Sequence, residues 1–487
     1  MSISISAESL CNGQFPKTDA CRQTQDIKKL DDKRKGGGAT VPIRVSRFSR
    51  RDFMSYFPKW KLKTDGIIAP DERLPLGQTL AMGVQHVVAM FGSTILAPLL
   101  MGFDPNVAIL MSGLGTLIFF VIVGGHVPSY LGSSFAFIGV VIAATGYTAG
   151  SGLNGNLSVA LGGIIACGFI YAIVGLIVMG TGVQWIEKLM PPVVTGAVVA
   201  VIGLNLAPTA VKSVGTGTFN ACIAIITMVC VGAVAVYTRG MIQKLLILVG
   251  ILLSYIIYFI LANVLGLGPA INFSIISNAA WFGLPSFESP SFDMNAILLI
   301  TPVVIILIGE NLGHVKAVTA MTGRNLDPYM GRAFLGDGVA TMFAASFGGT
   351  GVTTYGENIG VMAATQVYST LIFAVAACIA ILLGFSPKFG AIIQTIPQPL
   401  LGGVSIVVFG LIAVAGARIW VVNHVDFGNN RNLIVAAVTL ILGAGDFTLN
   451  IAGFTLGGIG TATFGAILLN ALMNRGSNRE GEPLIER

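Results

Sequence analysis

The stretch VTTYGEN, residues 352–358, lies between two runs of small and apolar residues. It combines hydroxyl groups, an aromatic ring, a glycine, an acid and an amide. A second polar stretch, GENLGH at residues 309–314, ends a largely apolar run. An ionisable side chain at membrane depth is costly and therefore indicates a functional site. The fold and the function both depend on whether these stretches lie within a membrane.

The composition favours a membrane protein. The chain has 487 residues, of which 54% are hydrophobic and only 10% are charged, whereas a soluble domain carries about 25% charged residues. Its 62 glycines suit closely packed membrane helices. The sequence contains no Walker A motif, metal-ligand spacing or nucleic-acid motif. We therefore expect a polytopic membrane protein that is not an enzyme, has no cofactor or metal, and binds no nucleic acid.

The charge is concentrated at the start of the chain. Residues 1–76 hold 15 of the 28 Lys and Arg residues and 9 of the 22 acids. We interpret this region as a cytoplasmic basic tail that is largely disordered. Its end, residues 47–63, alternates bases with aromatic side chains. This segment could rest on an anionic membrane surface, or it could be a solvated lead into the first helix.

The rest of the chain divides into about fourteen apolar segments, and a spanning helix needs ~20 residues. Two of them are too short and too rich in Ser, Thr and Gly to span alone: 133–147 and 353–366. The full set is 77–100, 105–124, 133–147, 157–180, 189–207, 219–237, 242–264, 294–314, 334–348, 353–366, 368–385, 390–415, 432–446 and 455–473.

The distribution of bases predicts the orientation. With the basic tail inside and fourteen crossings, eleven Lys and Arg residues after the tail fall on the cytoplasmic side and two, Lys212 and Lys388, fall outside. This bias is what the positive-inside rule describes. We expect both termini in the cytoplasm and the protein in the cell (inner) membrane.

The sequence also predicts an internal repeat. GSSF at 132–135 resembles VTTY at 352–355, since both have two hydroxyl groups before an aromatic ring. Pro192, Gly196, Gly203 and Leu204 recur at a constant offset as Pro399, Gly403, Gly410 and Leu411. Two halves of seven segments would enter the membrane from opposite sides. Short, interrupted segments at matching positions of an inverted repeat indicate a transporter site near the midplane.

Three side chains are the first candidates for that site. Glu310 and His314 are four residues apart and would share one helix face. Glu357 begins a short helix, where main-chain amides and a carboxylate can converge on a small polar ligand. Alternatively, Glu310 ends its helix at the cytoplasmic edge, and Glu357 neutralises its own helix terminus. A buried carboxyl group favours its neutral form, so the Glu310–His314 pair suggests proton coupling.

Other polar residues have two interpretations. Gln85 and His86 could form a hydrogen bond between helices. Asp337 could be an interfacial acid or part of a proton path, and Asp104 and Asp446 are expected at helix ends.

These motifs resemble those of the uracil and pyrimidine permeases of the nucleobase:cation symporter family, also called nucleobase–ascorbate transporters. The resemblance covers roughly residues 54–474. It rests on Gln85-His86 with the following AMFG, on LGSSFAF at 131–137, on Glu310 with Gly313-His314, and on TTYGENIG at 353–360. Two features depart from the family pattern. Ser93 stands where a related uracil permease has alanine, and Thr365-Gln366 stands where the signature has Thr-Arg.

The resemblance implies an all-α membrane protein with fourteen transmembrane segments in a 7+7 inverted repeat, and short antiparallel strands in segments 3 and 10. It implies a core domain (77–182 and 293–386) and a gate domain (183–292, with an external loop, and 387–474), followed by a cytoplasmic tail (475–487). The implied substrate-binding residues are Glu310, Glu357, Gly356, Phe135, Ser93 and Tyr355. Glu310 and His314 would couple protons, with Asn358 and His86 in support.

The sequence therefore predicts a proton-coupled uracil importer that works by alternating access, with thymine or xanthine as further substrates. A xanthine or urate permease of the same family is the alternative, and an anion exchanger of the same fold is a more distant one. Two acids at the site argue against an anion. A homodimer remains open.

Overall fold

Two short strands in the interior organise the chain. In the computed structural model, which describes residues 56–148, 152–451 and 454–476, strand β3 (Leu131–Ser133) pairs antiparallel with β4 (Val352–Thr354). Each strand leads into a short helix, α4 (Ile138–Thr145) after the 3₁₀ turn η2 (Phe135–Phe137), and α16 (Gly356–Thr365). The predicted antiparallel strands in segments 3 and 10 are therefore present.

Longer helices surround this centre, and every predicted apolar segment contains at least one helix. Apolar side chains dominate these helices, as expected for a chain whose surface meets lipid. The helices and turns other than α4, α16 and η2 are α2 (Leu76–Met101), α3 (Pro105–Ile122), α5 (Leu157–Thr181), α6 (Gln184–Leu189), α7 (Pro192–Asn205), α8 (Ala207–Lys212), α9 (Thr218–Tyr237), α10 (Met241–Lys244), α11 (Leu246–Phe259), η3 (Ile260–Val264), α12 (Ser274–Asn278), α13 (Met294–Ile300), α14 (Val303–Thr322), η4 (Asp327–Tyr329), α15 (Met330–Ser346), α17 (Thr370–Gly384), α18 (Pro387–Gln394), α19 (Gln398–Val422), α20 (Asn430–Ala444) and α21 (Gly458–Gly476).

Length and composition identify fewer membrane spans than the fourteen predicted segments. Within the described residues, eight helical spans are long and apolar enough to cross a membrane, or nine if α17 and α18 form one span bent by 81°. Pro387 begins α18 at this bend, because proline cannot continue the hydrogen bonding of the preceding helix. The structure thus supports a mostly helical, multi-pass architecture.

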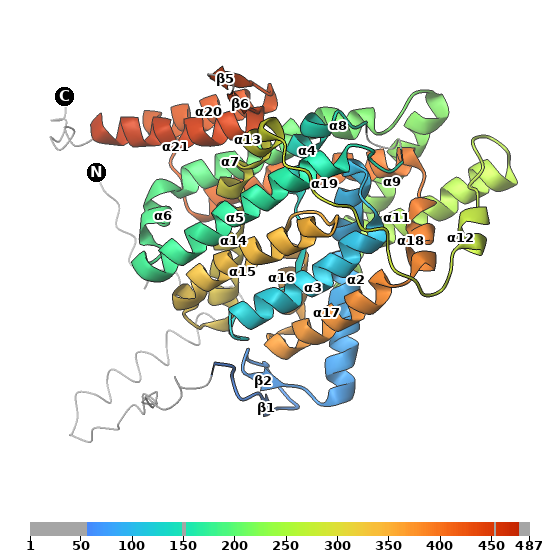
Figure 1. Ribbon diagram of the computed structural model, residues 1–487, viewed down its shortest axis with the longest axis horizontal. Helices are drawn as coiled ribbons and strands as arrows, with labels where there is room; N and C mark the ends of the chain where they lie inside the picture. Colours follow the sequence, from blue (N-terminus) through green and yellow to red (C-terminus); the bar gives the residue numbers. More distant parts are fainter. Residues whose placement is uncertain (1–55, 149–151, 452–453, 477–487) are drawn as a thin grey trace, which may run out of the picture. The chain divides into compact units, whose positions relative to one another are not determined.

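One set of helices packs around the site. Helix α5 packs along α15, and α3 packs against α15 and α17 while α2 packs against α17 (Figure 1). Glycine allows the closest of these approaches, since a Cβ atom on Gly338 would lie 2.5 Å from the main-chain nitrogen of Ala172. Close packing through small residues is the usual way in which membrane helices associate.

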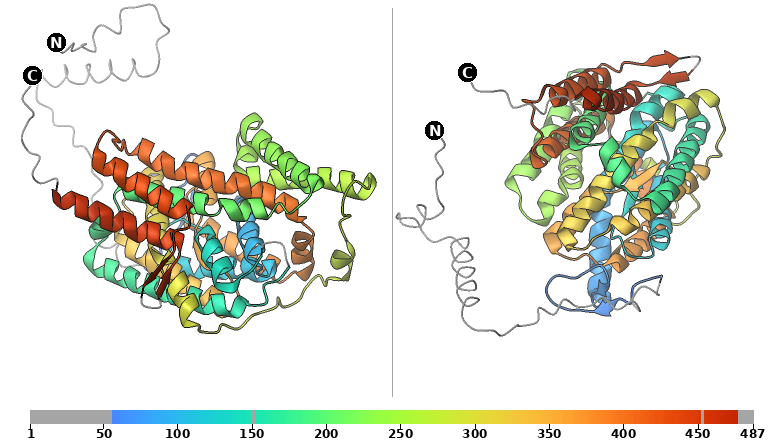
Figure 2. Two further views of the ribbon diagram at one scale, coloured as in Figure 1. Left: turned by 90° about the horizontal axis from the view of Figure 1, so that it is seen from above. Right: turned by 90° about the vertical axis from the view of Figure 1, so that its left-hand side faces the viewer.

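A second set packs around α7. Helices α19, α20 and α21 all contact α7, and α9 packs between α11 and α19. Figure 2 shows α20 and α21 side by side, next to the hairpin of β5 (Leu449–Ile451) and β6 (Phe454–Leu456). The predicted helix-end position of Asp446 is confirmed, because it follows α20 and its carboxyl accepts a hydrogen bond from Gly458 N–H.

The segment from Tyr56 to Leu74, which we call the strap, crosses the ends of several helices. It contains β1 (Lys61–Leu62) and β2 (Glu72–Arg73), which pair in parallel. Phe57 and Trp60 stack on Phe120 at centroid distances of 5.8 and 5.9 Å. Two aromatic side chains of the base-aromatic segment therefore pack on protein. Residues 47–55 lie outside the described residues.

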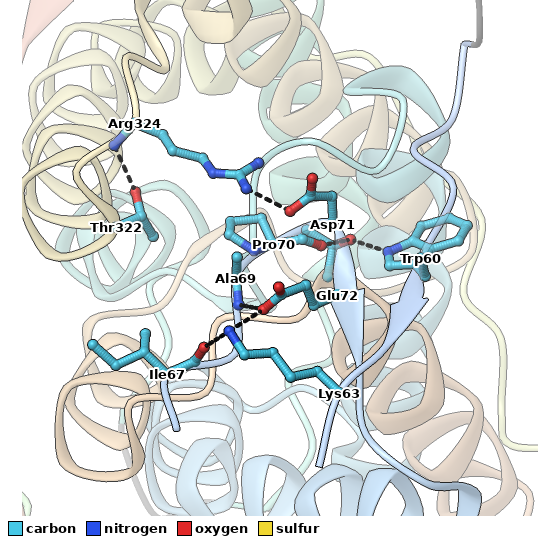
Figure 3. A network of polar contacts seen from close by, with 10 residues as sticks. Trp60, Lys63, Ile67, Ala69, Pro70, Asp71, Glu72, Thr322 and Arg324 are labelled. Atoms are coloured by element: carbon cyan, nitrogen blue, oxygen red, sulfur yellow. Dashed lines mark hydrogen bonds and ion pairs between the residues drawn. The ribbon is translucent and has the colours of Figure 1, made fainter. Parts of the chain in front are cut away.

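Polar contacts fasten the strap to two loops near the site helices (Figure 3). Ile68 N–H donates to Gln366 O (3.1 Å), and Tyr368 N–H donates back to Ile68 O (2.8 Å), just beyond the end of α16. Arg324, just beyond the end of α14, forms an ion pair with Asp71 (2.5 Å). The strap thus joins the ends of α14 and α16.

Candidate functional site

Helix α14 presents one polar face within an otherwise apolar surrounding. Glu310 and His314 are partly exposed and Gly313 between them is exposed, whereas residues 306–309 and 311–312 are buried. The helix continues to Thr322, so Glu310 lies in its interior. The alternative in which Glu310 ends its helix is therefore wrong, since α14 extends beyond residue 314, the predicted end of this membrane segment.

Glu357 lies in the first turn of α16, next to the polar face of α14. Tyr355 is the N-cap residue of α16, but its side chain accepts no hydrogen bond from the first turn. The first turn of such a helix favours negative charge, and the main-chain N–H of Glu357 interacts with the residue's own carboxyl group. Ser93 of α2, which is fully buried, donates a hydrogen bond from its Oγ to Oε1 of Glu357.

The two acids lie close enough for their charges to repel each other. Among the described residues, no hydrogen-bond donor reaches the carboxyl group of Glu310. Glu357 is thus held by the hydroxyl of Ser93, whereas the carboxyl group of Glu310 can bind a ligand or a proton. Such a pair cannot easily carry two negative charges in a poorly solvated site, because like charges disfavour double ionisation.

The imidazole of His314 bridges α14 and β4. Its Nδ1 lies 2.9 Å from Oγ1 of Thr354, the last residue of β4. A Cβ atom placed on Gly356 would lie 3.3 Å from Nε2 of His314, so the second ring nitrogen faces the exposed start of α16. The structure therefore brings Glu310, His314, Gly356 and Glu357 together.

Phe135 follows β3, so it lies at the opposite end of the antiparallel strand pair from Gly356. Its ring is partly exposed and meets Phe409 of α19 edge-on, with centroids 6.3 Å apart. The strand pairing also corrects the predicted alignment. Ser134 N–H donates to Gly351 O and Tyr355 N–H donates to Tyr130 O, both at 3.0 Å. Counted from these reciprocal bonds, Phe135 corresponds to Gly356 rather than to Tyr355.

Tyr355, an expected substrate-binding residue, is only 4% exposed. Its hydroxyl donates to Ser133 O (2.9 Å) and accepts a hydrogen bond from Thr94 (3.2 Å). A Cβ atom on Gly132 would lie 2.4 Å from the tyrosine ring, so glycine is needed for this contact. The geometry favours a brace across the two strands over a ligand contact.

Asn358 and His86 connect α16 to α2. The Nδ2 atom of Asn358 lies 3.0 Å from His86 Nδ1 and donates to His86 O at 3.0 Å. Both side chains are fully buried, and the His86 ring packs on Phe373 with centroids 4.6 Å apart. These contacts hold the short helix that bears Glu357.

Asp337 of α15 is a further buried acid, for which the sequence left two interpretations. It is 0% exposed, and its Oδ2 accepts hydrogen bonds from Asn311 (2.7 Å) and Thr353 (3.5 Å). Its Oδ1 has no partner among the described residues. Asn311 also donates to the hydroxyl of Tyr171 (3.0 Å). Asp337 is thus enclosed by protein, and its bonds to Asn311 and Thr353 tie α14 to β4.

Asp104, in contrast, lies at a helix end as predicted. It is the N-cap of α3, and its carboxylate accepts a hydrogen bond from Asn106 N–H at 2.8 Å. In the part of the chain that the structure describes, no three His, Cys, Asp or Glu side chains gather as a metal site would require.

Comparisons with known proteins agree with these features. The model of the family described as "Permease family" (Xan_ur_permease) matches residues 77–452. The chain is 67% identical to the "Putative pyrimidine permease RutG" of Escherichia coli K12, over 86% of this chain and 96% of that protein. It is 41% identical to a uracil permease of Paenibacillus larvae (84% and 97% covered) and 39% identical to the uracil permease of E. coli K12 (83% and 93% covered).

Solved structures share the fold at low sequence identity. A murine Slc26a9 anion transporter in the inward-facing state superposes with a TM-score of 0.64 at 12% identity, covering 93% of this chain and 75% of that one. The transmembrane domain of the cyanobacterial bicarbonate transporter BicA gives a TM-score of 0.55 at 16% identity, covering 76% and 97%. At these identities the likeness concerns the fold alone.

Proposed function

Because the chain belongs to the Permease family, whose model matches residues 77–452, we propose that it is a proton-coupled importer of uracil and related pyrimidine bases. Membership of this family makes it a multi-pass membrane transporter and not an enzyme, as the sequence predicted. The observation that carries the finer proposal is the meeting of Glu310, His314 and Glu357 on exposed faces of α14 and α16.

Uracil has the chemistry that this site could satisfy. Its flat ring carries two N–H donors and two carbonyl acceptors, which alternate on four consecutive ring atoms. The carboxylate of Glu357 would accept an N–H, and the first amides of α16 at Gly356 would donate to a carbonyl. Phe135 would pack on the ring face, since flat aromatic surfaces stack favourably. Ser93 would hold the Glu357 carboxylate, and Asn358 with His86 would support its helix.

Glu310 and His314 would exchange the coupled proton. A carboxyl group with no protein donor and a neighbouring imidazole can each hold one proton, and which one holds it can change with the surroundings. Loading a proton would remove the repulsion between the two acids and favour binding of a neutral base. The proton and the base would both be released when the site opens to the other side of the membrane.

The alternating-access part of the proposal is supported by which surfaces are exposed. On α14 the exposed positions continue from the site through Ala317 and Ala320 toward Thr322, whereas residues 306–309 on the other side of Glu310 are buried. On α16, Ala363 and Ala364 continue the exposed face. These helix ends lie beside Lys316 and Arg324, on the side that the distribution of bases predicts to be cytoplasmic. We infer an inward-open state.

The same proposal includes fourteen segments in two inverted halves, both termini in the cytoplasm, and a location in the inner membrane. The helices around α3, α5, α15 and α17 would form the core, and those around α7, α9 and α19 the gate. The reciprocal bonds of β3 and β4 support the repeat, because each strand contributes the same groups to the other.

The anion transporters of similar fold do not change this choice. Their likeness is confined to the backbone arrangement. An anion entering between Glu310 and Glu357 would meet two acids that already repel each other. A neutral base avoids this repulsion.

Uptake of radiolabelled uracil into proteoliposomes tests the proposal. We expect accumulation that increases with an inward proton gradient, and competition by unlabelled thymine, xanthine and uric acid ranks the substrates. Uptake that ignores the gradient would exclude symport. Glu310→Gln should impair binding, coupling or both, so its uptake should gain less from the gradient than the wild type.

A further inference from the structure

We propose that Thr354 is a positioning residue that holds the imidazole of His314 with its Nε2 atom toward the substrate. This inference rests on the proposed function, in which His314 belongs to the transport site. Thr354 itself is fully buried in β4 and does not face the exposed surface of the site. Its effect would be exerted through His314.

The contact between the two residues fixes one side of the ring. Thr354 Oγ1 lies 2.9 Å from His314 Nδ1, and the opposite nitrogen, Nε2, lies next to Gly356. Because an imidazole has only two ring nitrogens, an anchored Nδ1 determines where Nε2 points. Without the hydroxyl the ring would keep its interaction with the Thr354 main chain but could rotate more freely about its side-chain bonds, since His314 is only partly enclosed.

Thr354 belongs to a strand whose main chain is hydrogen-bonded on both sides. Next to Thr354, Tyr355 N–H donates to Tyr130 O of the chain entering β3 (3.0 Å). At the start of β4, Thr341 Oγ1 accepts from Val352 N–H (3.2 Å) and donates to Val352 O (2.9 Å). Strand β4 is therefore held from both sides, and the Thr354 hydroxyl has a fixed origin.

A hydroxyl group is also chemically suited to a histidine that changes its protonation. It can accept a hydrogen bond from a protonated Nδ1 or donate one to an unprotonated Nδ1. Thr354 can thus hold the ring in either tautomer and in the charged form, which a carbonyl or an ammonium group could not do. A proton could be gained or lost at Nε2 without loss of the orientation.

The competing explanation is that threonine is present because β-branched residues suit strands. Valine separates the two explanations, since it keeps the shape and the strand preference of threonine but has no hydroxyl. Thr354→Val, Thr354→Ala and Thr354→Ser would be compared with the wild type. Thr439→Val is the matched control, because Thr439 is a buried threonine whose hydroxyl bonds only to its own helix at Val435 O.

The first measurement is the ¹⁵N NMR spectrum of histidine-labelled protein in detergent or nanodiscs, without substrate. The chain has 4 histidines, and His314→Gln assigns the signal of interest. We expect Thr354→Val and Thr354→Ala to shift the two ring-nitrogen resonances of His314, and Thr354→Ser and Thr439→Val to leave them near their wild-type positions. Unchanged His314 resonances in the valine and alanine variants would overturn the proposal.

The second measurement is uracil uptake with its Michaelis constant and maximal rate. Thr354→Val should lower uptake efficiency about tenfold, the scale of one lost hydrogen bond at a buried site, and serine should restore most of it. Shifted resonances with unchanged uptake would also overturn the proposal, since the orientation would then have no effect on transport. A wild type that takes up no uracil but shows the expected shifts would instead disprove the proposed function.

Discussion

The segments that begin with β3 and with β4 share one frame but carry different side chains. In the first, Oγ1 of Thr116 accepts from Leu131 N–H (2.9 Å) and donates to Leu131 O (3.3 Å). In the second, Thr341 brackets Val352 in the same way. Each bracket satisfies a strand edge that would otherwise have buried, unpaired main-chain groups. The frame is thus built twice from the same parts.

The residues that follow each strand differ. Phe135 and Ala136 occupy the places that Gly356 and Glu357 hold in the other segment, when both are counted from the reciprocal bonds. The aromatic ring of Phe135 thus takes the place of the exposed main chain of Gly356, and the methyl group of Ala136 takes the place of the Glu357 carboxyl group. The comparison shows that the paired strands β3 and β4 support the site. The segment after β4 supplies the polar groups, and the segment after β3 supplies an apolar surface.

The largest effect is expected where the polar segment loses its charge. Glu357→Gln keeps the shape but removes the carboxylate that Ser93 holds, and we expect uracil binding to be abolished, a loss of at least about 100-fold. Isothermal titration with purified protein measures this. Ser93→Ala should weaken uracil binding less than Glu357→Gln does, because the Glu357 carboxylate remains. Binding by the Glu357 variant at wild-type strength would remove Glu357 from the site.

The second effect concerns stability and the polar residues that pack behind β3 and β4. Asp337 lies behind β4, and Ser112 takes its place behind β3, at the same spacing from the bracketing threonines. Asp337→Ala leaves the buried amide of Asn311 without one of its two acceptors, since only the Tyr171 hydroxyl remains, and should cost about 1–3 kcal/mol of the free energy of unfolding. Ser112→Ala should cost less, because its hydroxyl bonds to Ile109 O of its own helix and to one other group, the Tyr130 hydroxyl (3.2 Å), whereas the Asp337 carboxyl holds the side chains of Asn311 and Thr353. Thermal unfolding in detergent compares them, and equal losses would contradict the assignment.

A smaller effect is expected from the apolar segment. Phe135→Ala should weaken uracil affinity about two- to tenfold through loss of ring contact, with little change in the proton dependence of uptake. Tyr355→Phe should show the opposite pattern, since its hydroxyl bonds to Ser133 O. It should lower stability by about 0.5–1.5 kcal/mol and leave affinity unchanged. Weaker uracil binding by the Tyr355 variant would indicate that Tyr355 contacts the ligand.

The smallest effect should come from the strap, outside both segments. The Ala69 N–H, together with Lys63, lowers the pKa of Glu72 below its ordinary 4.5. A depressed pKa contributes stability above pH 4.5, and this contribution is lost as the pH falls through the lower folded value. Limited proteolysis near the strap should therefore increase only below about pH 4.5, and less so in Glu72→Gln. Since Glu72 is partly solvent-exposed, the contribution is at most about 1 kcal/mol.

The sequence predicted most of the helices and the broken segments because apolar runs and their interruptions are local signals. It left open whether Glu310 ends its helix at the cytoplasmic edge. In the fold α14 continues past Lys316 to Thr322, and Lys316 is paired with Glu187 (2.9 Å) and Asp327 (2.8 Å). Such pairing depends on residues distant in the sequence.

The alignment of the two broken segments was one residue off for a related reason. Two hydroxyl groups before an aromatic ring give the best match in letters, but the hydrogen bonds of the strands decide the register. The buried position of Asp337 was also beyond the sequence, since its partners Asn311 and Thr353 come from other elements. Charges and glycines indicate that a site exists, and only the fold shows which atoms meet.

The strap has a practical consequence for handling the protein. It is attached by Ile68 beyond the end of α16 and by Asp71 beyond the end of α14, so it spans the two helices that carry the acids. A shortened chain that begins at Tyr56 retains this tie, whereas one that begins at Leu76 loses it. Reporter domains and affinity tags are therefore best joined ahead of Tyr56, and a label on an exposed strap residue such as Lys61 would report the motion of both helices together.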